Sequence, residues 1–134
     1  MANLYKKFAT NPDKEKDGIW VNYDDARFLI ARAGGANTRF QVTLASKIRP
    51  YKKQIASQTL SDEESAKIMV EVFVEGVLRD WENVEDENDT PLEFTRGNAI
   101  KLLSDIPELL EFLREEAFLI GNFKDSLTEE TVKN

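Results

Sequence analysis

Carboxylates are the side chains with which this chain could perform acid–base chemistry, and two pairs of them have helical spacing. Glu71 and Glu75 stand four residues apart, as do Glu111 and Glu115, so each pair shares one face of a helix. The chain contains no histidine and no cysteine, which excludes a Ser-His-Asp triad, a thiol nucleophile, a zinc finger and the Glu-x-x-His ligands of di-iron bundles. Ion pairing with basic neighbours such as Lys67 accounts for the first pair. The pattern therefore predicts no catalytic residues, no metal site, no cofactor and no enzyme.

An acidic segment and a basic segment could each bind a charged ligand. Residues 86–90 resemble the start of an EF-hand loop, but Pro91 and Gly97 occupy the positions where that loop needs glycine and glutamate. We therefore predict a solvated turn there. Residues 47–53 carry four basic side chains around Tyr51, which could contact phosphates. Because the whole chain has a net charge of −7, docking to an acidic protein surface is the better interpretation, and no nucleic-acid partner is predicted.

Charge is distributed unevenly along the 134 residues. Residues 1–58 contain 11 Lys and Arg against 5 Asp and Glu, whereas residues 59–134 contain 7 against 20. This asymmetry indicates two surfaces with different partners, head-to-tail self-association, or halves that neutralise each other within one fold. No apolar run approaches the length of a membrane span, and residues 1–18 lack the apolar region of a signal peptide. We therefore expect a cytosolic protein with no membrane partner.

The order of local signals predicts a hairpin followed by helices. Residues 1–17 are polar and predict a flexible N-terminal arm. Residues 18–32 are rich in β-forming side chains on both sides of a turn at Asp24, which predicts a β-hairpin. Asn37 or Thr38 should cap a helix whose apolar residues, within 40–55, recur at helical spacing. Pro50 should kink this helix or divide it in two.

Two further helices carry more apolar surface than one packed face requires. Ser61 and Glu64 have capping-box spacing at the start of a central helix that should end near Trp81. Thr95 should cap a short helix that ends near Asp105, and a last helix should run over residues 107–120. Apolar side chains outside the main stripe of either helix are the predicted partner-binding residues, namely Ile68, Val72, Phe112 and Leu119.

These elements predict a mainly α fold of the α+β class, a helical domain with a small N-terminal β-hairpin packed on the central helix. A single domain should span residues 18–123, because the chain has the length of one domain. Residues 124–134 should form a polar C-terminal tail. We expect Trp20 and Trp81 to lie in the core rather than to act as interface anchors.

Turn-forming and apolar residues follow a specific order between Trp81 and Leu103, and a second group lies upstream where Gly18-x-Trp20 leads into the second strand. The residues in question are Trp20, Phe28, Arg32, Trp81, Asn83, Val84, Pro91, Leu92, Phe94, Thr95, Asn98, Ala99 and Leu103. In them, and over about residues 18–123, the chain resembles the tail assembly chaperones of long-tailed, siphovirus-type bacteriophages. Side-chain chemistry gives these residues structural roles, in a rigid corner formed by a helix, a crossing segment and a second helix.

The resemblance implies a function in building the phage tail. Such chaperones bind and solubilise the tape measure protein in the host cytoplasm, are displaced as tube subunits polymerise, and are absent from the mature virion. A frameshift-extended form would contact the tail tube protein, and self-association is expected. Two alternatives remain open from the residues alone. One is an acidic interaction module, such as a regulator or a DNA-mimic inhibitor, and the other is a weak carboxylate enzyme.

Overall fold

A three-stranded antiparallel sheet, in the order β1-β2-β3, organises the fold. In the computed structural model, which describes residues 1–125, β1 spans Ile19–Tyr23, β2 spans Ala26–Ile30 and β3 spans Leu78–Glu82. The turn between β1 and β2 places Asp24 at φ 52°, a left-handed conformation that Asp tolerates. The predicted N-terminal hairpin is therefore confirmed.

The predicted fold class, a mainly α domain with a hairpin packed on a central helix, is wrong in one decisive respect. The central helix α5 spans Asp62–Gly76 and does not continue to Trp81, which lies in β3. On β3, the side chains of Leu78 and Trp81 point into the core. Because β3 pairs with β2, the backbone groups along that edge of β2 are hydrogen-bonded, whereas in a lone hairpin they would be unpaired. The fold is α+β, and its third strand follows the first helices in the chain.

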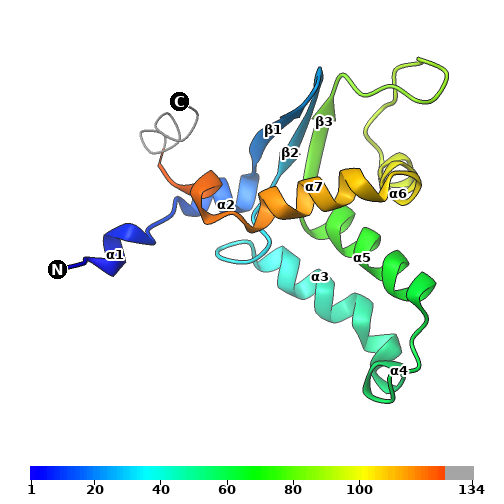
Figure 1. The fold of residues 1–134 in the computed structure, drawn as a ribbon, viewed down its shortest axis with the longest axis horizontal. Coiled ribbons are helices and arrows are strands. Elements are labelled where there is room, and N and C mark those ends of the chain that lie inside the picture. Colours follow the sequence, from blue (N-terminus) through cyan, green and yellow to red (C-terminus); the bar gives the residue numbers. More distant parts are fainter. Residues whose placement is uncertain (126–134) are drawn as a thin grey trace.

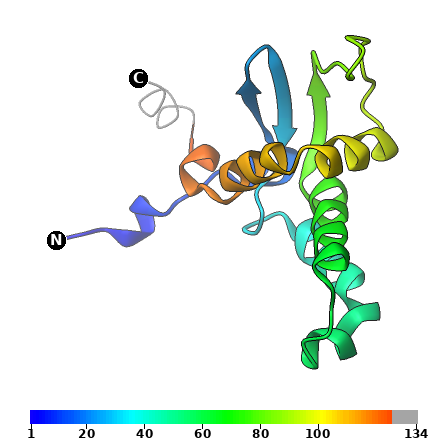
Figure 2. The same cartoon turned by 45° about the vertical axis from the view of Figure 1, so that its right-hand side comes forward.

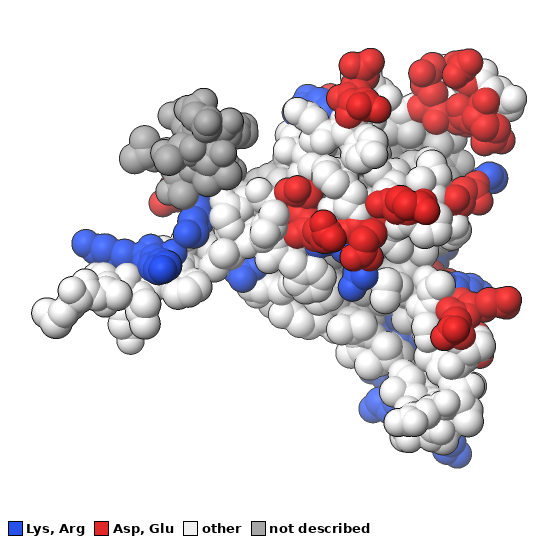
Figure 3. Space-filling view, in the orientation of Figure 1, with Lys and Arg blue, Asp and Glu red and all other residues white. Residues whose placement is uncertain are grey.

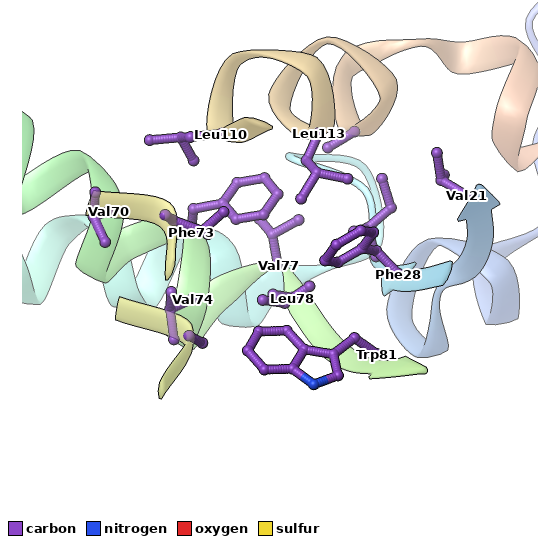
Figure 4. Close-up of a cluster of buried hydrophobic side chains, with 14 of the residues drawn as sticks. Val21, Phe28, Val70, Phe73, Val74, Val77, Leu78, Trp81, Leu110 and Leu113 are labelled. Atoms are coloured by element: carbon purple, nitrogen blue, oxygen red, sulfur yellow. The ribbon is translucent and has the colours of Figure 1, made fainter. Parts of the chain in front are cut away.

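One face of the sheet packs against the helices. Phe28 of β2 lies directly opposite Trp81 of β3, with ring centroids 6.3 Å apart in an edge-to-face arrangement. Figure 4 shows Phe28 between Trp81 and Leu113, which comes from α7 (Pro107–Phe118). Figure 2 shows α7 crossing in front of the sheet. Because Phe28 is only 2% exposed, this layer of sheet, aromatic rings and α7 forms the centre of the core.

A helical hairpin extends away from the lower end of the sheet (Figure 1). It consists of α3 (Thr38–Ile48), the 3-10 turn η1 (Arg49–Tyr51), α4 (Lys52–Ala56) and α5. The break after α3 confirms the effect expected of Pro50. Two predicted caps have different outcomes. Ser61 caps α5 by accepting from the Glu64 amide at 3.1 Å, whereas no side chain caps α3.

The N-terminal segment is attached to the last described helical turn. Helix α1 (Leu4–Lys7) stands away from the body in Figures 1 and 2, but α2 (Pro12–Asp17) packs beside the 3-10 helix η2 (Ile120–Phe123). The amide of Asn11 donates to the carbonyl of Phe123 at 2.7 Å. The second half of the predicted 1–17 arm is therefore part of the folded unit. Of the predicted 124–134 tail, the part beyond residue 125 lies outside the described residues.

A buried polar cluster joins α2, the β2–α3 loop and β3. Glu15 is 3% exposed and pairs with Arg32, while its other oxygen accepts from the Ala36 amide at 3.3 Å. Asn37, 1% exposed, donates to the carbonyls of Arg32 and Gly76 at 2.8 and 2.9 Å. Its oxygen accepts from Arg79 at 3.0 Å. Because buried polar groups are costly unless paired, this cluster fixes how the loop, the helical hairpin and the sheet meet.

Stability should depend on pH through Glu15. Burial alone would raise the pKa of its carboxyl, but hydrogen bonds from Arg32 and from the Ala36 amide outweigh burial and hold the pKa below its ordinary value of 4.5. As pH falls below that value the unfolded chain takes up the proton first, so the stabilisation is lost as pH falls through the folded pKa. We expect Glu15→Gln to lower the free energy of unfolding by about 2 kcal/mol at neutral pH.

Urea unfolding at a series of pH values measures this effect. The difference between the wild type and Glu15→Gln should be largest above pH 4.5 and should shrink as the solution becomes more acidic. A difference that stays constant, or that grows in acid, would show that the ion pair does not contribute as described.

Candidate functional site

An open apolar hollow of about 260 Å³ lies between the tip of the sheet and the junction of α6 (Arg96–Asp105) with α7. Its inner wall includes Phe28 and Val84, which are 2% and 9% exposed. Tyr23 and Ile106 stand at its edge and keep 50% and 42% of their surface exposed. We call this site the sheet-end hollow and define it by its apolar lining, Tyr23, Phe28, Val84, Leu102, Ile106 and Leu109. A concave apolar site with exposed edges is suited to apolar side chains of another molecule.

The rim of the sheet-end hollow is acidic. Glu85 and Glu108 belong to its lining, and Figure 3 shows acidic side chains gathered on the loop after β3 and in a row along α7. No basic side chain lines the hollow. An apolar site with this rim is complementary to an apolar segment that carries lysine or arginine beside its apolar residues.

A rigid corner supports the hollow from behind. The indole N–H of Trp81 donates to the carbonyl of Leu92 at 2.8 Å, and the amide of Leu92 donates to the carbonyl of Val84 at 2.8 Å. Phe94 packs edge-to-face on Trp81 with centroids 5.1 Å apart. Thr95 caps α6 by accepting from the amide of Asn98, as its position predicts. Residues 91–94, the crossing segment of the predicted corner, thus hold Val84 in the wall of the hollow.

The other residues of the predicted structural motif occupy varied places. Asn83 adopts φ 59° and donates to the carbonyl of Asp25 at 3.3 Å, which ties the loop to the hairpin turn. Pro91 pairs with Glu85 in an isolated bridge. Ala99 and Leu103 lie in the core, and the half-buried Arg32 pairs with Glu15. Trp20 differs from the expectation, because strand alternation places it on the outer sheet face, 37% exposed, with the Arg27 guanidinium 4.3 Å from its ring centroid.

The structure separates the four predicted partner-binding residues. Val72 is 6% exposed and Ile68 is half-buried. Both precede Gly76 by multiples of four residues and so share its face of α5, which meets α3. The second apolar side of α5 is therefore covered by α3 of the same chain. Phe112 is half-buried and packs on Tyr23, whereas Leu119 is 52% exposed. Binding by these four residues stays a prediction.

Sequence reasoning missed most of the lining of the hollow. Tyr23 had a signal, because it lies two residues after the buried Val21 and so shares the inward face of β1. Its ring packs edge-to-face on Phe112, with centroids 5.0 Å apart. Leu102, Ile106 and Leu109 had no such signal, since only the folded chain brings them beside Tyr23.

The first carboxylate pair, Glu71 and Glu75, is engaged by basic side chains from other helices. Lys47 lies 2.8 Å from Glu75 and 3.4 Å from Glu71, and Arg96 lies 3.0 Å from Glu75. Burial alone would raise the pKa of Glu75, but these two cations hold it below its usual value. Within residues 1–125 no group of three or more acidic side chains is arranged to hold a metal ion. Over the same residues no helix is both long and apolar enough to cross a membrane.

The acidic loop is a hydrogen-bonded turn. One carboxylate oxygen of Asp86 accepts from the amides of Asn88 and Thr90 at 2.9 and 3.0 Å. The amide of Asp86 also donates to the carbonyl of Thr90 at 2.9 Å. These bonds confirm the predicted turn, in which the loop side chains are exposed or half-buried.

Comparison with known proteins places the chain in a phage-related family. The model of the YdaY prophage protein family matches residues 35–134. The chain belongs to this family. The matched part begins just before α3 and includes every described element after β2. No curated protein and no solved structure matches the chain.

In this YdaY-family protein, the close approach of α3 to α5 should be sensitive at Gly76. A Cβ added there would lie 3.2 Å from the Cα of Phe40 and 3.5 Å from the Cβ of Thr43. We expect Gly76→Leu to separate the two helices and to lower the free energy of unfolding by about 2 kcal/mol or more. Gly97→Ala is the matched control, because a Cβ at Gly97 meets nothing within 4 Å.

Thermal and urea unfolding measure both variants. Gly97→Ala should leave stability unchanged or raise it by up to about 1 kcal/mol, as alanine does in helices. Equal stability of Gly76→Leu and the wild type would contradict the described packing of α3 on α5.

Proposed function

We propose that this prophage-family protein is a tail assembly chaperone, which binds and solubilises the tape measure protein and is displaced as tube subunits polymerise. The observation that carries the proposal is the sheet-end hollow, with Tyr23 and Ile106 exposed at its edge. A tape measure protein is a long helix whose apolar residues must be covered before the tube surrounds it. An open apolar site can cover such residues without any chemical step.

Charge supports the same proposal. The chain carries a net charge of −7, and acidic side chains occupy the rim of the hollow and the row along α7 (Figure 3). A bound client would be surrounded by like-charged copies of the chaperone, which repel other complexes and oppose aggregation. The acidic rim further specifies the client segment, which should contain apolar residues next to Lys or Arg.

Sequence provides the link to tail assembly in particular. Residues that resemble the motif of the tail assembly chaperones include Phe28, Asn83 and Val84, which line the hollow. Membership of a prophage protein family supports a phage origin. The tail tube protein, reached through a frameshift-extended form, is a second proposed partner.

Co-expression with the tape measure protein of the same genome tests the proposal. Ile106→Asp places a charge at the edge of the hollow, where repulsion by Glu85 and Glu108 and lost apolar contact should weaken binding at least about tenfold. Pull-down and light scattering measure the amount and mass of the complex. The client should remain in the pellet with the variant and enter solution with the wild type.

Val42→Asp is the matched control, since Val42 is 68% exposed on α3 and does not line the hollow. It makes the same apolar-to-acidic change and should bind the client as the wild type does. Circular dichroism establishes that both variants are folded. A client that stays insoluble with the folded wild type, or that is equally soluble with Ile106→Asp, would overturn the proposal.

An acidic interaction module is the second candidate, and one observation favours it. The acidic row along α7 and the acidic loop lie on one face in Figure 3. A regulator or DNA mimic would use this face to bind a basic protein, and its binding would weaken steeply with added salt. Binding to the tape measure protein that depends on Ile106 and changes little with salt would exclude this alternative.

A further inference from the structure

The segment before α2 presents apolar side chains that nothing in the described chain covers. Tyr5 is 94% exposed, Leu4 58% and Phe8 57%, and α1 contains no buried residue. Lys6 and Lys7 give the same segment two positive charges. We call residues 1–10 the α1 segment. It combines three exposed apolar side chains with a basic character.

A surface of the opposite character lies at the carboxyl end of α7. Phe118 and Leu119 are 57% and 52% exposed there. They line an open depression of about 390 Å³ together with Glu111, Arg114, Glu115 and Glu116. Arg114 forms an ion pair with Glu111 at 3.3 Å. Because three glutamates and one arginine line the depression, its net charge is negative. We call it the α7-end surface and define it by Glu111, Glu115, Glu116, Phe118 and Leu119.

We propose that the α1 segment docks on the α7-end surface of a second copy of this chain, and that two copies exchange their segments reciprocally to form a closed dimer. Apolar side chains meet apolar side chains in this contact, and Lys6 and Lys7 meet Glu111 and Glu115. Both the hydrophobic and the electrostatic character of the two surfaces are thus complementary.

The position of the α1 segment determines the symmetry. Its base is fixed at Asn11, which donates to the carbonyl of Phe123 at 2.7 Å. Phe123 lies only four residues beyond Leu119, so each copy carries its donor segment and its acceptor surface at the same end. Ten residues reach at most about 35 Å, enough to cross a twofold axis between two such ends. A twofold exchange makes two identical contacts and leaves no open end for further growth.

The contact area is sufficient for a specific dimer. Aromatic side chains bury on the order of 150 Å² or more each when covered. Two exchanged segments, each with Tyr5 and Phe8, and the two surfaces they cover therefore reach the roughly 1,200 Å² of a small specific interface. The sheet-end hollow lies at the other end of α7, roughly 15 Å away at the helical rise per residue, so the dimer does not depend on the proposed function.

Variants that reverse the charge of one surface at a time test the proposal. Sedimentation of the full chain without an N-terminal tag should show a dimer. Lys6→Glu with Lys7→Glu places acids against acids, and Glu111→Lys with Glu115→Lys places bases against bases, so each double variant alone should dissociate at least about tenfold more readily. Mixed in equal amounts, the two variants should restore a dimer, because each acidic segment then meets a basic surface and each basic segment an acidic one.

The control is Lys52→Glu with Lys53→Glu, which makes the same charge change on exposed residues of α4. It should leave the dimer unchanged. Circular dichroism confirms that each variant is folded, and no client is present, so a failed proposal here leaves the chaperone test unaffected. A monomeric wild type, an open series of larger assemblies, a dimer that survives both double variants, or a mixture that does not recover would each overturn the exchange.

Discussion

Phe28 and Trp81 face each other across the paired strands β2 and β3, and this contact joins parts of the chain that lie far apart in sequence. Without this pairing, β2 would have an unpaired edge, and the chain after α5 would not fold back along the sheet. The pairing fixes the point below the sheet from which α5 extends, whereas α7 crosses one sheet face (Figure 2). It also directs the loop after β3 past the hairpin turn. The crossing segment then closes on Trp81 through the bond to Leu92. The sheet-end hollow exists because this sequence of contacts leaves the sheet tip and the α6–α7 junction facing each other.

The buried polar cluster performs a different task from the apolar core. Glu15 and Arg32 neutralise each other, and Asn37 connects the β2–α3 loop to the last carbonyl of α5. Apolar packing alone would tolerate several angles between the helical hairpin and the sheet, whereas these bonds require one arrangement. The same cluster holds α2 against the body and therefore fixes the point from which the α1 segment emerges. The buried polar cluster therefore also influences where the exposed α1 segment lies on the outside of the molecule.

Helix caps and helix breaks could be predicted from the sequence, whereas the pairing of strands that lie far apart in the chain could not. The cap at Ser61, the break at Pro50 and the cap at Thr95 depend on a few neighbouring residues, and each was predicted correctly. Residues 78–82 continue an apolar pattern compatible with helix, and only a partner strand distant in sequence makes them a strand. Likewise, periodicity revealed the surplus apolar side of Ile68 and Val72 but could not show that α3 covers it. The hollow is invisible to sequence reasoning because residues from four separate segments line it.

In the function proposed for this protein, the sheet-end hollow holds an apolar segment of the tape measure protein. A photoreactive amino acid introduced at Ile106, in a chain co-expressed with that protein, tests it most directly when the cross-linked peptides are mapped. We expect cross-links to apolar client segments that carry Lys or Arg nearby, and few from the same group placed at the distant Val42. Cross-links from position 42 with none from position 106, or cross-links from 106 only to other copies of the chain, would contradict it.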